Sequence, residues 1–225
     1  SENSSKTSGG KDNPPWGKWG QEDSSTTEED TASAKGLKAG GDIKISNATI
    51  TTDTSDDSIH SNSNVTIESG TFNLKSGDDG IHADTSTVIN NGNIVIEKSY
   101  EGIEGSNVTI NGGTIELTAS DDGINSAGGS DSSSMGGRMG QNSFTENSDI
   151  YIKITGGKVT VDASGDGLDS NSNLIIEGGE IYVNGPTNDG NGALDYDGTA
   201  TISGGTFVAV GSSGMVQGFS DSSTQ

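Results

Sequence analysis

The sequence predicts an all-β fold, a parallel β-helix in which about seven coils of three short strands stack on one another. The first observation is a motif typified by Asp78-Asp79-Gly80-Ile81-His82, which recurs at intervals of 22, 22 and 21 residues. The second is that two further segments of each repeat alternate apolar and polar residues, as half-buried strands do. The third is that no window carries a helical period. A fixed period with strand-like segments is typical of a solenoid.

The recurring motif supplies the first strand of each coil. It generally places an apolar residue two positions after an acidic one, which indicates one core position beside one column of charge. The copies are Asp57-Ser58-Ile59-His60, Asp79-Gly80-Ile81-His82, Glu101-Gly102-Ile103-Glu104, Asp122-Gly123-Ile124-Asn125 and Asp166-Gly167-Leu168-Asp169, with a last variant at Gly192-Ala193-Leu194-Asp195.

Two more columns of alternating residues supply the second and third strands. The second strands are expected at 43–45, 65–67, 88–90, 108–110, 150–152, 174–176 and 200–202. The third are expected at 50–52, 72–74, 94–96, 115–117, 159–161, 181–183 and 207–209. Small-residue corners such as Gly112-Gly113 separate them, because glycine allows a positive φ or a close backbone approach at a sharp bend. A leucine-rich repeat would need a leucine framework, and a propeller blade about twice this length.

The regular pattern divides the chain into three parts. Residues 35–217 are the predicted β-helix, and residues 1–34 are a polar tether, cap or excursion that contains Trp16 and Trp19. Residues 218–225 are a predicted C-terminal tail. A Gly/Ser-rich insertion at 128–148 lengthens one coil, because Asp122 and Asp166 are two periods apart with only one pair of strand motifs between.

Composition excludes several classes of function. The chain has 36 glycines among 225 residues and 27% hydrophobic residues, so a thin repetitive core fits better than a broad one. Its 33 acidic residues against 11 basic ones give a net charge of −22, which would repel nucleic acid and anionic membranes. Without cysteine, thiolate metal sites and disulfides are excluded. No stretch approaches the roughly 20 apolar residues of a membrane span.

Stacked coils would place equivalent acidic residues one above another. At a spacing of about 4.8 Å two carboxylates repel by about 3.5 kcal/mol at an effective dielectric of about 20. Calcium, which takes six to eight oxygen ligands, would relieve this repulsion; the alternative is a solvated acidic edge whose Asp-Gly pairs only make turns. The candidate calcium ligands are Asp56, Asp57, Asp78, Asp79, Glu101, Glu104, Asp121, Asp122, Asp166, Asp169, Asp189 and Asp195.

Other residue types offer fewer functional candidates. His60 and His82 fall one coil apart, but with no third histidine we expect packing or hydrogen bonds to carboxylates rather than a transition-metal site. Tyr151 and Tyr182, at the outward middle positions of their strands, and Trp16 and Trp19 are candidates for stacking on sugar rings, with ordinary packing as the alternative. Lys44 and Lys153 are further candidates for binding carbohydrate. No nucleophile elbow supports a serine triad, and acidic pairs for glycoside hydrolysis are too common here to be specific.

Three motifs carry a family resemblance. Residues 78–84, 100–105 and 190–198 resemble those of a bacterial family of secreted carbohydrate-binding proteins with a right-handed parallel β-helix similar to that of pectate lyases. The resemblance covers about residues 35–217 and implies calcium between coils. It also implies binding to plant cell-wall polysaccharides, cellulose and acidic pectic chains among them, and display on the bacterial surface. The polar start, Ser1 to Ser5, similarly favours an exported protein, and we expect a monomer.

Three classes of function remain open. A calcium-dependent lyase needs a base, yet the single arginine, Arg138, falls in the Gly-rich insertion. Lys44 and Lys153, expected to point outward from corresponding strand positions, and Lys75 and Lys98, near a common corner, are alternative bases. Binding without turnover needs no base, so a noncatalytic polysaccharide-binding protein is the favoured function. A structural spacer or adhesin explains the solenoid but leaves the acidic columns unexplained.

Overall fold

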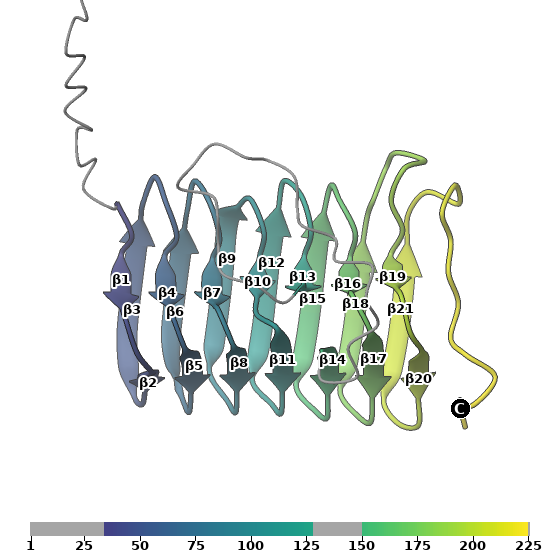
Figure 1. The fold of residues 1–225 in the computed structure, drawn as a ribbon, viewed down its shortest axis with the longest axis horizontal. Helices are drawn as coiled ribbons and strands as arrows, with labels where there is room; N and C mark the ends of the chain where they lie inside the picture. The colour runs from purple at the N-terminus through teal and green to yellow at the C-terminus, as the bar shows by residue number, and fades with distance from the viewer. Residues whose placement is uncertain (1–33, 128–149, 225) are drawn as a thin grey trace, which may run out of the picture. The chain divides into compact units, whose positions relative to one another are not determined.

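A computed structural model of the chain describes residues 34–127 and 150–224. These residues form 21 β-strands in three parallel sheets of seven, and no helix occurs among them. Strands that are neighbours in a sheet come from successive coils, so each coil contributes one strand to every sheet (Figure 1). The predicted all-β parallel solenoid of about seven coils is confirmed.

The three sheets differ in strand length, and sheet C has the longest strands. Sheet A contains β1 (Leu37–Ala39), β4 (Ile59–Ser61), β7 (Ile81–Ala83), β10 (Ile103–Glu104), β13 (Ile124–Ser126), β16 (Leu168–Ser170) and β19 (Leu194–Tyr196). Sheet B contains β2 (Ile43–Ile45), β5 (Asn64–Ile67), β8 (Ser86–Ile89), β11 (Asn107–Ile110), β14 (Tyr151–Ile154), β17 (Asn173–Ile176) and β20 (Ala200–Ile202). Sheet C contains β3 (Ala48–Asp53), β6 (Gly70–Lys75), β9 (Asn93–Ser99), β12 (Thr114–Ala119), β15 (Lys158–Ala163), β18 (Glu180–Asn184) and β21 (Thr206–Val210).

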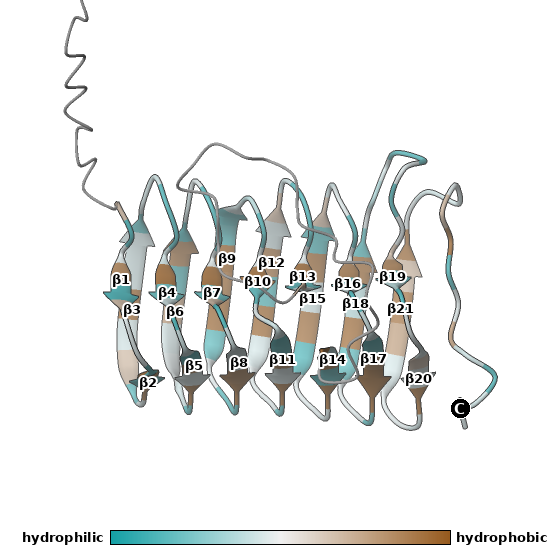
Figure 2. Ribbon diagram, viewed as in Figure 1, coloured by the Kyte–Doolittle hydropathy of each residue, from teal (hydrophilic) through white to brown (hydrophobic). Residues whose placement is uncertain are grey.

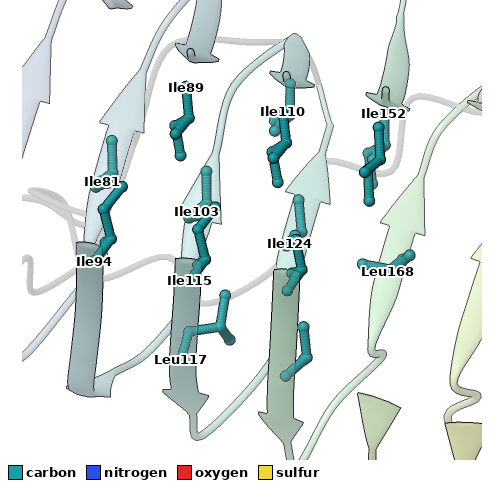
Figure 3. Packing of buried hydrophobic residues seen from close by; sticks show 14 of the residues in the cluster. Ile81, Ile89, Ile94, Ile103, Ile110, Ile115, Leu117, Ile124, Ile152 and Leu168 are labelled. Carbon is teal, nitrogen blue, oxygen red and sulfur yellow. The ribbon is translucent and has the colours of Figure 1, made fainter. Parts of the chain in front are cut away.

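The core is a set of aliphatic ladders that run through the coils. Ile81, Ile103, Ile124 and Leu168 are register partners on adjacent strands of sheet A, and all are fully buried (Figure 3). Many outward positions are polar, so hydrophobic and hydrophilic bands alternate along strands such as β15 (Figure 2). Each coil thus buries its apolar residues only by stacking on its neighbours, as expected for a solenoid.

In four copies of the repeat glycine follows the acidic residue, at positions where a Cβ atom would lie too close to the next coil. A Cβ atom on Gly102 would lie 2.3 Å from the carbonyl oxygen of Gly123, and one on Gly123 would lie 2.6 Å from that of Gly167. The corner between sheets B and C uses glycine differently, since Gly113 has a φ of 93°. Glycine is therefore required at Gly102 and Gly123 by the close approach of the next coil, and at Gly113 by the positive φ.

Two strands of sheet B have a register that differs from the sequence expectation. Val65 pairs with Thr87 rather than with Val88, so Thr87 points into the core and Val88 outward. The Thr87 hydroxyl donates a 2.7 Å hydrogen bond to the carbonyl of Glu104, which satisfies the buried polar group. The register expected for the strand at 150–152 is also wrong by two residues, because Val108 pairs with Ile152 and not with Ile150. The strand spans Tyr151–Ile154.

Residues after the last strand contact the final coil. Ser220 and Thr224 donate backbone hydrogen bonds to the carbonyls of Ala200 and Ile202, and Phe219 packs edge-on against Phe207 at 5.2 Å. The predicted insertion lies between β13 and β14 and, with residues 1–33, is outside the described residues. In the described part of the chain no helix is long and apolar enough to cross a membrane. The domain boundaries stay predictions.

Candidate functional site

The acidic stack, defined here as Asp57, Asp79, Glu101, Asp122 and Asp166, lies in the turns that lead into sheet A. Its aspartates have a structural role that the sequence did not indicate. Each Oδ1 accepts a hydrogen bond from the backbone N–H at the equivalent position of the next coil. The distances are 3.1 Å from Asp57 to Asp79, 3.3 Å from Asp79 to Glu101, 2.6 Å from Asp122 to Asp166 and 2.5 Å from Asp166 to Gly192.

Lys35 and His60 contact the first carboxylates of this stack. Lys35, largely buried, forms ion pairs with Asp56 at 2.8 Å and with Asp57, which has 0% exposure. His60 Nδ1 is 2.7 Å from Asp57 Oδ2. Burial alone would raise the pKa of Asp57, but the bonds from His60 and Lys35 outweigh it and hold the pKa below its usual value.

His82 compensates the next group of carboxylates. Its Nδ1 contacts Asp79 Oδ2 at 3.2 Å and also Glu104, while its Nε2 is 3.1 Å from Asp84. Burial by itself would lower the pKa of His82. The hydrogen bonds to Asp79 and Glu104, with the charges of these two groups, together have a larger, opposite effect and raise the pKa to about 12. The imidazolium is therefore charged at neutral pH and occupies the place that a metal ion would take among these acids.

The two histidines do not have the geometry of a shared metal site, although His60, His82 and Asp84 place ligand atoms within 4.8 Å of one another. The rings stack with centroids 4.7 Å apart and planes 8° from parallel. A nitrogen lone pair lies in the plane of its ring, so one ion cannot lie in both planes. Stacking and hydrogen bonding to carboxylates, as expected from the sequence, describe both residues.

The later part of the stack is different, because its acids meet without a counter-charge. Carboxylate oxygens of Asp122, Asp166 and Asp169 lie within 4.8 Å of one another. We call these three residues the acidic cluster. Within residues 34–127 and 150–224, no lysine, arginine or histidine forms an ion pair with any of them. Burial, followed by the neighbouring carboxylates, raises the pKa of Asp122 to about 7, of Asp166 to about 6 and of Asp169 to about 8.

An amide oxygen without a hydrogen-bond partner belongs to the same surroundings. Asn125 is 6% exposed and lies three residues after Asp122 in the repeat motif. It pairs in register with Asp169. Its Nδ2 donates a 2.9 Å hydrogen bond to Glu101 Oε2, but its buried Oδ1 has no partner. Burial and the charges of Glu104 and Asp79 raise the pKa of Glu101. The site thus offers several oxygens, and the part of the chain that the structure describes supplies no cation to the acidic cluster.

The remaining acidic candidates lie at different distances from this cluster. Asp195 pairs in register with Asp169, accepts a 2.5 Å hydrogen bond from Gln217 and adds to the charge around Asp122. Asp121 adds to the same charge, whereas Asp78 is grouped with Asp56 and Asp57 near Lys35. Asp189 is exposed and accepts a hydrogen bond from Ser212; its expected place near Asp166 and Asp195 stays a prediction.

The candidate sugar-binding residues lie on sheets B and C. Tyr182 has the predicted outward position at the middle of β18 and is 36% exposed. The prediction for Tyr151 is wrong in position: it begins β14, where it is half-buried, and Lys153 holds the middle position. Lys44 and Lys153 share one outward column, and they form ion pairs with Glu68 at 2.8 Å and Glu177 at 3.0 Å. Trp16 and Trp19 lie outside the described residues.

Comparison with known proteins supplies a family. A family model described as "carbohydrate-binding domain-containing protein" matches residues 4–80 and 64–146. The chain belongs to this carbohydrate-binding family. Searches of curated proteins and of solved structures gave no match. The family supports a polysaccharide partner and is consistent with a role other than catalysis.

Within this carbohydrate-binding protein, sequence reasoning missed three residues of the acidic edge: Lys35, Asp84 and Asn125. Lys35 lies 22 residues before Asp57, so extending the period by one coil would have placed a cation at the start of the acidic stack. Asn125 occupies the repeat position that is held by Glu104 and Asp169 in the adjacent coils. A neutral amide at this position was the sequence signal that the charge changes from one coil to the next. Asp84 follows the motif by two residues and carried no periodic signal.

Proposed function

We propose that this protein is a noncatalytic, calcium-binding protein that recognises plant cell-wall polysaccharides, cellulose and acidic pectic chains, outside the bacterial cell. The observation that carries the proposal is the acidic cluster. There, three carboxylates have no ion-pair partner among residues 34–127 and 150–224, and Asn125, the register partner of Asp169, has a buried Oδ1 without a hydrogen-bond partner. Membership of the carbohydrate-binding family supports the polysaccharide partner.

The donor atoms of the cluster suit calcium. All are oxygens, and calcium accepts carboxylates and amide carbonyls in irregular arrangements of six to eight ligands. Without an ion, two carboxylates 4.8 Å apart repel by about 3.5 kcal/mol at an effective dielectric of about 20. Asp122, Asp166, Asp169 and Asn125 would hold the ion, which would supply positive charge where the described residues form no ion pair with these acids.

Such an ion would also explain how a strongly acidic protein binds an acidic glycan. The chain carries a net charge of −22, which repels a polyuronate. A calcium ion at the edge of the coils reverses the local charge and can accept uronate oxygens in ligand positions that the protein leaves open. Binding of acidic chains should therefore require calcium.

The lysines support binding without turnover. A base that removes a proton works best with a pKa near the operating pH. Lys44, Lys153 and Lys75 instead pair with carboxylates, and the bond from Lys75 to Glu97 raises the pKa of that lysine. We propose that Lys44, Lys153 and Lys75 do not act as the base of a lyase.

Incubation with polygalacturonate and with cellulose, each with calcium or with a chelator, tests the proposal. We expect retention of the protein on both polymers, loss of the polygalacturonate fraction in chelator, and no growth of absorbance from unsaturated uronate. Calcium-dependent growth of that absorbance would identify a lyase. No retention on either polymer would favour a structural spacer or adhesin.

A further inference from the structure

We propose that the outward face of sheet C binds an uncharged polysaccharide chain, with Tyr182 stacking on a sugar ring. This inference rests on the proposed polysaccharide binding and assigns it a surface separate from the acidic cluster. Under this proposal the acidic cluster, with calcium, binds acidic glycans, and the outward face of sheet C binds neutral ones.

The first observation is the size and regularity of this face. The strands of sheet C are five to seven residues long, against two to three in sheet A and three to four in sheet B. Val95, Glu116, Thr160 and Tyr182 are register partners on four adjacent strands and point outward in one column. At about 4.8 Å per strand the column is about 14 Å long, a suitable length for contact with several sugar units.

A depression lies along the same column. It is lined by Val95, Glu97, Glu116, Thr118, Thr160 and Asp162. The register of β9 shifts next to it, where Lys75 pairs with Lys98 instead of Glu97. Such bulges are frequent beside binding sites because they redirect side chains. The lining combines an apolar surface with hydroxyl and carboxylate groups that can bind sugar hydroxyls.

Tyr182 borders this depression, because its register partner Thr160 contributes to the lining. Two neighbours flank the exposed tyrosine. Lys158 Nζ lies 5.9 Å from the ring centroid, and the phenolic hydroxyl donates a 3.4 Å hydrogen bond to Glu180. A ring supported in this way loses little side-chain entropy when a sugar stacks on it.

The charge of the face selects the class of glycan. The strands of sheet C carry five carboxylates, those of Asp53, Glu97, Glu116, Asp162 and Glu180, against the three lysines Lys75, Lys98 and Lys158. A polyuronate would meet net repulsion, whereas neutral sugars donate hydroxyl hydrogens to carboxylates. An uncharged chain is therefore the fitting partner.

Calorimetry with cellohexaose as the neutral probe and trigalacturonate as the acidic one tests the assignment. We expect Tyr182→Ala to weaken cellohexaose binding by about tenfold or more and to leave calcium-dependent trigalacturonate binding unchanged. Tyr182→Phe should retain binding, because the ring is preserved. Leu37→Ala, which removes a similarly exposed large apolar side chain from sheet A, is the control and should bind both probes as the wild type does.

Chemical-shift mapping on the wild type supplies a test that needs no variant. Cellohexaose should shift amide signals of β9, β12, β15 and β18 and leave those of β5 and β8 in place. Shifts confined to another sheet, or unchanged cellohexaose affinity in folded Tyr182→Ala, would overturn the assignment while leaving polysaccharide binding intact. Failure of the wild type to bind either probe would overturn the proposed function itself.

Discussion

The carboxylate of Asp122 accepts a 2.6 Å hydrogen bond from the backbone N–H of Asp166, which is 44 residues later in the chain but in the adjacent coil. The same bond recurs between other members of the acidic stack. An aspartate in this position satisfies a buried N–H with one oxygen and keeps the second oxygen for a cation. Lys35 and His82 supply that cation in the first coils, and we propose that calcium supplies it in the later ones.

Removing one carboxylate of the acidic cluster should weaken calcium binding. We expect Asp169→Asn to lower or abolish the rise in melting temperature that calcium gives the wild type, because an ion that binds only the folded state stabilises it by mass action. Thermal melts with millimolar calcium and with chelator measure the difference. Asp221→Asn, at an exposed position near the C-terminus, is the control and should respond to calcium as the wild type does.

The calcium-free protein should lose stability as the pH rises from about 4 toward about 6.5. The folded pKa values of Asp122, Asp166 and Asp169, about 7, 6 and 8, lie above their unfolded value of 3.8. The folded state therefore binds protons more tightly, and stability that is fully present below pH 3.8 declines as the pH rises through the folded values. His82 adds no slope below about pH 6.5, where it is protonated in both states.

Chelator melts across this range, with wild type and Asp169→Asn compared, check the pH dependence. The variant should show a shallower decline. A wild-type melting temperature that rises over the same interval would contradict the raised pKa values.

Replacing His82 should destabilise the fold whether or not calcium is present. In His82→Ala the buried carboxylate of Asp79 and the half-buried carboxylate of Glu104 would lose their counter-charge, and loss of a buried counter-charge typically costs about 3 to 5 kcal/mol. Urea unfolding in calcium and in chelator gives the free energy of unfolding. If added calcium fully restored the stability of His82→Ala, this part of the edge would itself be a metal site.

Alanine at Gly102 should destabilise the solenoid, because its Cβ would lie 2.3 Å from the carbonyl oxygen of Gly123. We expect a loss of about 1 to 3 kcal/mol, as for overpacked cores. Gly40→Ala is the matched control: its Cβ would meet no atom within 4 Å, so its unfolding free energy should change by less than about 0.5 kcal/mol. Equal unfolding midpoints for the two variants would contradict the close approach of the coils.

The fold was predictable because every coil repeats the same requirement for a buried aliphatic residue. The local register of β8 was not predictable, because Val88 is more apolar than Thr87 and would be expected in the core. Thr87 is buried instead because its hydroxyl donates a hydrogen bond to the carbonyl of Glu104, a contact that only the folded structure reveals. The acidic candidates followed from the repeat as well. Their division into compensated and uncompensated groups depends on Lys35, His82 and Asn125, whose partners are one coil away.

An anomalous difference map from crystals grown with calcium tests the central claim most directly. We predict a calcium peak coordinated by Asp122, Asp166 and Asp169 with Asn125 Oδ1, and no peak between His60, His82 and Asp84. A peak at the histidines, or none at the acidic cluster with millimolar calcium, would contradict the account.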